Sequence, residues 1–401
     1  MARRRMIRLT IEDPSEYGLD LQIKRMSVPG LLEGIVRTGF TTGACAQAGV
    51  RACLDALVTG VWAEKVRIRL PNGRNADFSL KSYESGMRGG LPWALASIIK
   101  DGGDDPDCTH GAEIITEIRL TGEGRIIYRA GTGVGRITKP GLAIPVGDPA
   151  INPVPRKFMA GEFLASKESI AAHLALGNPG IEITISIPDG EQRSEKTLNA
   201  RLGIVGGLSI LGTKGIVVPF STAAYRASIG QALEVARARN LDTVVMTTGG
   251  QSEAFAMKLY PDLPQEGFVQ IGDFTGYSVR QAARTGIRRI IMAGFLGKFS
   301  KLAKGVTQTH AAGSQVDLSF LVDLARQTGS SEEVCAEILK ANTARHVGEI
   351  LEASGNTKFF PLLCRNIVTH LKRISPHPPE MEILLANFRG ELIGRAGSSG
   401  E

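Results

Sequence analysis

The spacing of hydrophobic and polar residues changes near residue 200. Before that point, short segments alternate between apolar and polar positions or are rich in β-branched residues, which is typical of strands. These segments are 65–70, 76–82, 113–120, 125–130 and 181–187. Apolar residues at helical spacing fill 44–60, and a second helix is expected over 161–175. Strands in runs with helices between them indicate an α+β fold.

Beyond residue 200, segments that predict strands alternate with segments that predict helices. The glycine-rich apolar run 203–211 comes first. The expected helices are 223–239, 252–260 and 278–285, and the expected strands lie within 241–250, 267–273 and 287–294. This alternation predicts a parallel sheet covered by helices. Two further helices over 331–353 and 359–373, and a closing hairpin or strand over 381–397, complete the prediction.

These patterns predict an α+β N-terminal domain plus a smaller α/β domain with a parallel sheet. Residues 1–30 are a polar lead-in with little periodicity. Residues 31–197 form the α+β domain and carry the candidate substrate-binding loops. Residues 198–401 form the α/β domain together with the C-terminal helices and strand. The polar stretch 190–200 marks the boundary.

Composition narrows the range of partners. The chain has 401 residues, a net charge of +7 and only 5% aromatic residues, so a stacking platform for nucleic acid is not expected. No window of eighteen apolar residues predicts a membrane span, and the basic start runs into acidic residues, unlike a signal peptide. Five cysteines lie far apart, which argues against a disulfide framework and a cysteine zinc site. A protein of the reducing cytoplasm is therefore expected.

Glycines and an acid occur where the predicted parallel strands end, which is where open α/β sheets bind ligands. Glycine lets a ligand approach the backbone, and a carboxylate at a strand end can bind ribose hydroxyls. The alternative is that the glycines only form tight turns, and no GxGxxG spacing is present. The candidate residues are Gly206, Gly207, Ser209, Gly212, Thr248, Gly249, Asp273 and Gly294.

In the first half, Thr41 and Thr42 stand directly before the helix of small residues. Threonine caps helices well, and free amides at a helix start could bind a substrate carboxylate; the alternative is a cap with no further role.

An acidic segment over 100–111 carries four aspartates with His110 close behind. Crowded carboxylates raise one another's pKa and suit proton transfer, which makes Asp104, Asp105 and His110 the catalytic candidates. A plain acidic turn is the alternative.

Basic residues occupy two further segments. The proline-rich loop 130–156 carries Arg136, Lys139 and Arg156, and a stiff basic loop suits a substrate with many carboxylates. A purely structural loop is the alternative. Lysines 298, 301 and 304 recur at three-residue intervals, so a helix would present them on one basic face, with Lys298 a candidate for substrate binding. A solvated face is the alternative.

Eight of these segments, in the same order from about Gly39 to the C-terminus, resemble the CbiD family, the cobalt-precorrin-5B C(1)-methyltransferases. The segments are GFTTGAC, KDGGDDPDCTHG, GTGVGRITKPGL, INPVPR, GIVGGLSILGTKGIV, TTGGQSE, IGDFTGY and GKFSKLAKGVTQTH. The resemblance implies methyl transfer from S-adenosylmethionine to C1 of a cobalt-containing corrinoid precursor in anaerobic cobalamin synthesis. It also implies an N-terminal α+β domain joined to a smaller α/β domain.

On this interpretation, cobalt arrives inside the substrate and the protein holds no metal of its own. The expected partner is the corrinoid substrate, with no nucleic acid and no membrane, and a homo-oligomer is compatible with the sequence. Two other functions stay open. One is a nicotinamide-dependent oxidoreductase that acts on a carboxylated tetrapyrrole, and the other is a tetrapyrrole carrier without catalysis.

Overall fold

The computed structural model describes residues 36–174, 176–310 and 316–397. The lead-in predicted over 1–30 lies outside these described residues. The described part of the chain contains one mixed sheet in its first half, one mostly parallel sheet in its second half, and three two-stranded sheets.

The first-half sheet has the strand order β4-β5-β6-β9-β7. All neighbouring strands are antiparallel except β7 and β9, which are parallel. Strand β6 alternates between buried and half-buried residues, as expected for a strand with one covered face. The strands are β4 (Ser82–Arg88), β5 (Leu91–Ile99), β6 (Glu113–Thr121), β7 (Ile126–Ala130) and β9 (Gly180–Ser186). The sequence pattern missed β5, because its continuous apolar run shows no alternation.

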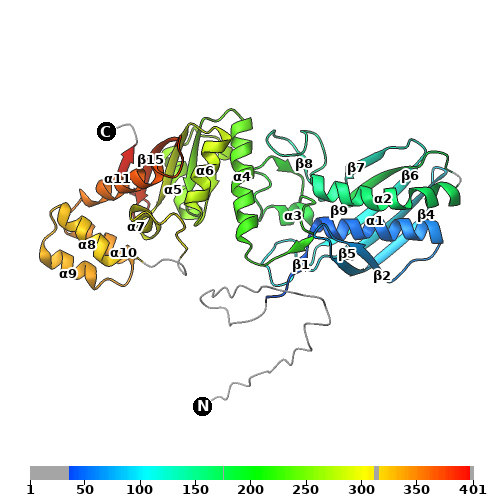
Figure 1. Cartoon of the computed structure of the whole chain (residues 1–401), viewed down its shortest axis with the longest axis horizontal. Coiled ribbons are helices and arrows are strands. Elements are labelled where there is room, and N and C mark those ends of the chain that lie inside the picture. Colours follow the sequence, from blue (N-terminus) through cyan, green and yellow to red (C-terminus); the bar gives the residue numbers. More distant parts are fainter. Residues whose placement is uncertain (1–35, 175, 311–315, 398–401) are drawn as a thin grey trace, which may run out of the picture. The chain divides into compact units, whose positions relative to one another are not determined.

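Helices α1 (Thr42–Thr59) and α2 (Pro153–His173) lie side by side, with α1 against β5 and β6 (Figure 1). Small residues let α1 approach the sheet closely: a Cβ added at Gly49 would lie 2.4 Å from Thr116 Oγ1. The prediction for α1 is confirmed. Helix α2 begins at Pro153, earlier than expected, because the first turn of a helix tolerates proline.

Short two-stranded sheets lie beside these elements, and two of them include residues beyond position 200. Strands β1 and β11 pair antiparallel, as do β8 with β10 and β2 with β3. Their bounds, with those of one short helix, are β1 (Gly39–Phe40), β2 (Lys65–Arg69), β3 (Asn75–Ser79), β8 (Arg136–Ile137), β10 (Ile204–Val205), β11 (Ile216–Val217) and α3 (Gly190–Ser194).

The second-half sheet has the order β13-β12-β14-β15-β16. Strands β13, β12, β14 and β15 are parallel to one another, and β16 pairs antiparallel with β15 as the closing hairpin. The predicted parallel sheet is thus confirmed, with one antiparallel edge strand. The strands are β12 (Thr243–Thr247), β13 (Phe268–Gln270), β14 (Arg289–Phe295), β15 (Glu380–Ala386) and β16 (Leu392–Gly397).

The segment 331–353 forms two helices instead of the single predicted one. Thr343 accepts a hydrogen bond from His346 N and so caps a new helix. Helix α8 was not predicted. The second-half helices are α4 (Thr222–Ala238), α5 (Gly250–Leu259), α6 (Thr275–Thr285), α7 (Leu296–Ala303), α8 (Leu318–Gln327), α9 (Glu332–Leu339), α10 (Ala344–Ala353), α11 (Phe359–Lys372) and the 3-10 turn η2 (Gln265–Gly267).

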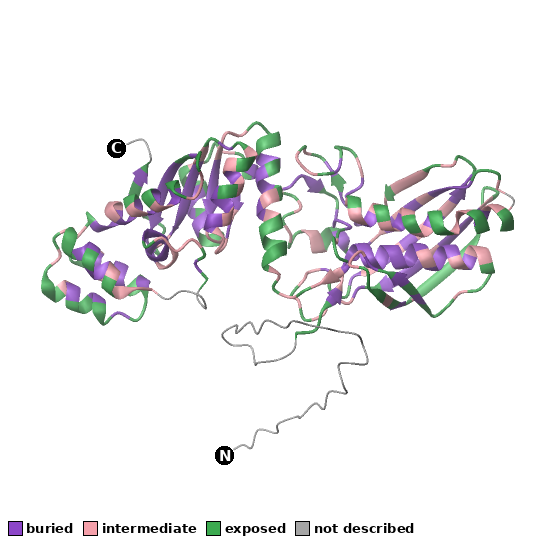
Figure 2. Ribbon diagram, in the orientation of Figure 1, coloured by how far each residue is buried: buried purple, intermediate pink, exposed green. Residues whose placement is uncertain are grey.

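Buried residues form separate hydrophobic clusters in the two halves (Figure 2). One cluster contains α1, α2 and the first-half sheet, and also takes in Leu208 and Ile210. A larger one contains α4, α6, α7, α8, α11 and one face of the second-half sheet, and also takes in Ile137, Ile144 and Ala150 of the first half. A small third cluster lies on the opposite face of that sheet, with α5. The mixed α/β character is confirmed, while the two-domain division stays a prediction. None of the helices in the described residues is long and apolar enough to cross a membrane.

Candidate functional site

The carboxyl ends of three parallel strands meet at one edge of the second-half sheet. Lys298, in the first turn of α7, reaches across this edge. Its Nζ donates to Thr248 O at 3.0 Å and to Gly272 O at 3.4 Å, and it lies 3.0 Å from Asp273 Oδ1. We call Thr248, Gly249, Gly272, Asp273, Lys298 and Thr309 the strand-end cluster.

In the described part of the chain, Asp273 is held through one of its two carboxylate oxygens. Its Oδ1 faces Lys298 and accepts a hydrogen bond from Thr309 Oγ1 at 3.0 Å. Oδ2 accepts no hydrogen bond from the described residues, and the side chain is 23% exposed. A carboxylate fixed through one oxygen can present the other to a ligand hydroxyl, which fits the predicted contact with ribose.

Space and unmatched polar atoms lie beside this cluster. A Cβ added at Gly249 or Gly250 would meet no atom within 4 Å, so a ligand can approach the backbone there. Among the described residues, Thr247 Oγ1 and Thr275 Oγ1 are buried without a hydrogen-bond partner. These features fit a polar ligand at the strand ends. Gly294 has a packing explanation instead, because a Cβ there would lie 2.3 Å from Phe299 Cε1.

The glycine-rich stretch 206–215 does not lie at these strand ends, so that part of the prediction is wrong. No residue of 203–211 belongs to the second-half sheet. Instead, Leu208 and Ile210 form bridges with Val134 and Ile151, and the stretch packs against the start of α1. The sequence pattern shows that this stretch is buried, which would hold in the second-half sheet as well as beside α1. The spacing within the stretch does not show which distant segment it packs against. Gly206, Gly207, Ser209 and Gly212 are thereby separated from Thr248 and Asp273 in the topology.

A second polar site lies at the N-terminus of α1, in a cavity of about 170 Å³ that we call the Lys100 pocket. At its wall, Lys100 Nζ lies 2.8 Å from Asp107 Oδ2, and the Lys100 side chain is only 1% exposed. Ser209 Oγ is buried there without a partner among the described residues. The lining residues are Thr41, Thr42, Lys100, Asp107, Cys108, Thr109, Thr197, Asn199, Leu208, Ser209, Leu211 and Val217.

Asp107 carries a firmly held negative charge. Burial opposes ionisation, but hydrogen bonds from Lys100 and Thr109 outweigh it and lower the pKa of the Asp107 carboxyl. Thr109 donates through its backbone N at 2.8 Å and through its hydroxyl at 2.7 Å. The half-buried Asp107 carboxylate therefore forms an ion pair with the buried Lys100 side chain.

The three catalytic candidates of the acidic segment are each engaged by nearby groups. Asp104 Oδ2 accepts from Arg37 N at 2.6 Å, and Asp105 Oδ2 accepts from Phe220 N at 3.1 Å. His110 Nδ1 accepts from Gly102 N at 3.0 Å. These contacts support the segment's backbone and leave the proposed proton transfer untested.

The crowded carboxylates of this segment were expected to raise one another's pKa, but Asp101 and Asp107 have lowered pKa values. The pKa of the Asp101 carboxyl is lowered mainly by the hydrogen bond that Asp101 accepts from Arg37. The pKa of Asp107 is lowered by the contacts described above. Each of these two carboxylates has its own cation, so the expectation is wrong for both.

The threonines before α1 are placed as predicted, but the amides behind them are occupied. Thr41 is the N-cap and accepts from Ala44 N at 3.2 Å. Gly43 N donates to Leu211 O at 2.9 Å, so it does not offer a free amide to a carboxylate. Thr42 Oγ1 accepts from Leu211 N at 2.9 Å and donates to Ser209 O at 3.2 Å. The helix start thus fixes the stretch that carries Ser209.

The basic residues of the loop 130–156 differ in their availability. Arg136 is exposed, and Lys139 Nζ lies 3.0 Å from Glu266 Oε1. Arg156 is tied to its own loop: it pairs with Asp148 at 3.0 Å and donates to Ile151 O and Pro149 O. Arg156 therefore braces the loop, which accounts for its position without a substrate, and Arg136 is the more accessible of these cations.

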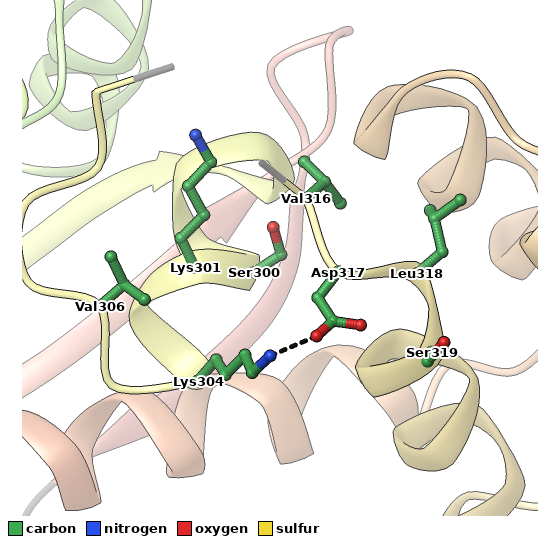
Figure 3. Close-up of a pocket in the computed structure, with 8 residues that line it drawn as sticks. All are labelled: Ser300, Lys301, Lys304, Val306, Val316, Asp317, Leu318 and Ser319. Atoms are coloured by element: carbon green, nitrogen blue, oxygen red, sulfur yellow. Dashed lines mark hydrogen bonds and ion pairs between the residues drawn. The ribbon is translucent and has the colours of Figure 1, made fainter. Parts of the chain in front are cut away.

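The lysines of α7 do not form a single basic face, so that prediction is wrong. Lys298 points to the strand-end cluster, and Lys301 Nζ donates to Thr309 O at 3.0 Å. Lys304 pairs with Asp317 across a cavity of about 540 Å³, while Lys301 points away from that pair (Figure 3). Burial lowers the pKa of the Lys301 ammonium, against the opposing effect of Asp273. The spacing of the three lysines would place them near one another on a helix. In the structure, each of them instead contacts a different group elsewhere in the fold.

Sequence reasoning missed Lys100 and Thr309 as site residues and gave Asp107 no separate role. A lysine directly after the apolar run of β5 could have been noticed, because buried lysine is rare without a partner. Among the described residues, no group of three or more histidine, cysteine, aspartate or glutamate side chains is placed to hold a metal ion.

Two family models match the chain. The model described as CbiD matches residues 33–219, and the model described as CbiD, C-terminal domain, matches residues 308–397.

Curated relatives are similar over most of the chain. The cobalt-precorrin-5B C(1)-methyltransferase of Geobacillus sp. (strain WCH70) is 46% identical over 361 residues, which is 90% of this chain and 96% of that protein. The protein of the same name from Priestia megaterium is 46% identical over 367 residues, or 91% and 97% of the two chains. That of Leptospira borgpetersenii serovar Hardjo-bovis (strain JB197) is 41% identical over 360 residues, or 90% and 95%.

The cobalamin biosynthesis protein CbiD from Archaeoglobus fulgidus is a solved structure that matches this chain. It is 23% identical, with a TM-score of 0.34, over 80% of this chain and 86% of that one. The family models and the curated relatives agree with the eight sequence segments, and this chain belongs to the CbiD family.

Proposed function

We propose that this chain transfers a methyl group from S-adenosylmethionine to C1 of cobalt-precorrin-5B, giving cobalt-precorrin-6A in anaerobic cobalamin synthesis. The observation that carries the proposal is the match to relatives of that name at 46% identity over nine-tenths of the chain. The two polar sites described above support a reaction with two substrates of different chemistry.

We assign donor binding to the strand-end cluster. Asp273 would accept hydrogen bonds from the ribose hydroxyls through Oδ2, and the open backbone at Gly249 and Gly250 would lie against the adenosine. Thr247 Oγ1 and Thr275 Oγ1 offer further polar contacts. The donor supplies a methyl group on a positively charged sulfonium.

We assign acceptor binding to residues of the first half, with Arg136 and Lys139 as cations for its carboxylates. Asp104, Asp105 and His110 remain the candidates for taking up a proton as charge redistributes in the ring. The new C1–methyl bond takes its electron pair from the electron-rich macrocycle, and the breaking methyl–sulfur bond leaves its pair on sulfur. No covalent protein intermediate is needed, and positioning can supply up to ~7–11 kcal/mol of the barrier reduction.

Mass spectrometry of the ring tests the proposal. The full chain is incubated with cobalt-precorrin-5B and S-adenosylmethionine that carries a 13C-labelled methyl group. Gain of one labelled methyl group on the ring, at C1 by NMR, is the expected result. An unchanged ring mass with tight ring binding would favour a carrier. A change of ring mass that depends on NADPH, together with NADPH binding and no S-adenosylhomocysteine binding, would favour an oxidoreductase.

A further inference from the structure

Lys100 is a buried cation with unused hydrogen-bonding capacity. It follows β5 directly, its side chain is 1% exposed, and it lines the Lys100 pocket. Asp107 Oδ2, at 2.8 Å, is its hydrogen-bond acceptor among the described residues. An ammonium group has three N–H donors, so two of them are left without an acceptor there.

Ser209 adds a second unmatched donor to the same cavity. Its side chain is buried, and Oγ has no hydrogen-bond partner among the described residues. The backbone of Ser209 is fixed independently, because its carbonyl oxygen accepts from Thr42 Oγ1 at 3.2 Å. A buried hydroxyl without a partner is unfavourable unless a ligand or ordered water satisfies it.

The unmatched groups that line the pocket require an acceptor. Asp107 already accepts from Lys100 and from both donors of Thr109. The N-terminus of the long helix α1 adds a positive partial charge at Thr41 and Thr42. Two N–H groups of Lys100 and the hydroxyl of Ser209 therefore match a group that only accepts hydrogen bonds, and an ionised carboxylate is such a group.

We propose that the Lys100 pocket binds a substrate carboxylate, with Lys100 and Ser209 as its hydrogen-bond donors. This inference rests on the proposed function, because that function supplies two carboxylate sources. One is an acetate or propionate side chain of the ring, and the other is the carboxylate of the methionine part of the donor. The cavity of about 170 Å³ accepts a side chain of this kind and not the ring itself.

Ser209→Ala is the main test. A purely structural Ser209 predicts no loss of stability and unchanged kinetics, because the substitution removes a hydroxyl that has no partner among the described residues. The proposal predicts an unchanged melting temperature and a KM for one substrate that rises roughly 10- to 100-fold, the effect of losing one hydrogen bond to a charged group. A rise for cobalt-precorrin-5B identifies a ring carboxylate, and a rise for S-adenosylmethionine identifies the donor. If neither KM changes, the proposal is overturned.

Ser97→Ala is the matched control. Ser97 is also fully buried in the first half, but its Oγ lies 2.7 Å from Ser82 Oγ and it does not line the pocket. Ser97→Ala should lower the melting temperature and leave both KM values unchanged. The two serine variants thus give opposite patterns if Ser209 binds substrate.

Lys100 needs a paired design. Lys100→Met leaves the half-buried Asp107 without its cation, so Lys100→Met/Asp107→Asn, which removes both charges, is measured beside it. A folded double variant should show a KM increase for the same substrate as Ser209→Ala, with kcat much less affected. Wild-type KM values in that variant would contradict the proposal.

The wild-type assay separates the two levels of inference. If the wild-type chain adds no methyl group to the ring, the proposed function fails. The pocket is then tested by equilibrium binding alone, with cobalt-precorrin-5B and S-adenosylhomocysteine as probes. If the wild-type chain is active but the Ser209 and Lys100 variants bind and turn over both substrates normally, only the pocket assignment fails.

Discussion

Lys298 Nζ lies 3.0 Å from Asp273 Oδ1 and joins the carboxyl ends of β12 and β13 from the first turn of α7. The two residues were predicted for different substrates, Asp273 for the donor and Lys298 for the ring. Their contact means that Lys298 holds the carboxylate that we assign to ribose. The ammonium group of Lys298 already contacts three oxygen atoms of the strand-end cluster. These contacts explain its position without a direct contact to the corrinoid substrate.

Asp273→Ala should weaken donor binding and leave acceptor binding unchanged. The variant removes the carboxylate whose Oδ2 is open to a ligand hydroxyl, and hydrogen bonds to charged groups contribute about 1.5–3 kcal/mol. The dissociation constant for S-adenosylhomocysteine, measured by titration calorimetry, should rise about tenfold or more.

Asp242→Ala is the control for Asp273. Asp242 precedes β12, at the amino ends of the parallel strands, whereas Asp273 follows the carboxyl end of β13; Asp242 pairs with Arg237 and Arg288. Its substitution should leave donor affinity unchanged. Equal affinities in the Asp273 and Asp242 variants would remove the ribose assignment.

Lys298→Met should destabilise the ligand-free protein more than Lys304→Met. Lys298 contacts two backbone carbonyls and a carboxylate that is 23% exposed, whereas Lys304 is 51% exposed and, among the described residues, pairs with Asp317. We expect a loss of about 1–2 kcal/mol for Lys298→Met and about 0–1 kcal/mol for Lys304→Met. Urea unfolding followed by circular dichroism measures both. A larger loss for Lys304→Met would show that the strand ends do not depend on Lys298.

Local sequence signals predicted the elements whose structure is decided locally. Thr41 before a run of small residues gave the start of α1, and alternating apolar segments over 241–294 gave three parallel strands with helices between them. Boundaries were less accurate where a cap or a proline decides them, as at Thr343 and Pro153.

The site could be predicted only in part, because its contacts join distant segments. Thr248 and Asp273 were placed at one sheet edge correctly, since parallel strands share that edge. Ser209 was assigned to the wrong sheet, because a glycine-rich apolar sequence does not indicate which segment it will pack against. Lys100 was overlooked because the apolar run before it suggests burial, but its pairing with Asp107 follows only from the fold.

Gly212→Ala should be among the more destabilising glycine substitutions. Gly212 has φ +136°, and an added Cβ would lie 2.2 Å from Oγ1 of Thr41, the cap of α1. Backbone strain of about 1–2 kcal/mol and overpacking of about 1–3 kcal/mol should add. Gly390→Ala is the control, because Gly390 has φ +80° with no atom within 4 Å of an added Cβ, and it should lose only the strain energy. Equal losses in urea unfolding would mean that the chain relaxes around position 212.

The stability difference between the wild-type chain and Asp107→Asn should disappear in acid. The folded-state pKa of Asp107 is lowered, so its contribution is complete above the unfolded pKa of about 3.9 and declines as the pH falls towards the folded value. Asp107→Asn should therefore be less stable than wild type at neutral pH and approach it below about pH 4. Thermal unfolding at a series of pH values measures this. A difference that stays constant through the acid range would contradict the ion pair as its source.

Cys108 offers a probe of the Lys100 pocket that does not depend on catalysis. It lines the pocket and is partly exposed, whereas Cys45, Cys53, Cys335 and Cys364 are buried. Burial raises the pKa of the Cys108 thiol, and Asp107 raises it further, so labelling by iodoacetamide should be slow at neutral pH and accelerate as the pH rises. Burial raises the pKa of Cys45 and Cys364 to about 12, which together with their inaccessibility should keep them unlabelled until the protein unfolds.

Peptide mass spectrometry should therefore find Cys108 alkylated first, and the substrate whose carboxylate enters the pocket should slow that reaction. If neither cobalt-precorrin-5B nor S-adenosylhomocysteine protects Cys108 at saturating concentration, the pocket is not occupied in either complex, and its buried lysine must be explained by folding alone.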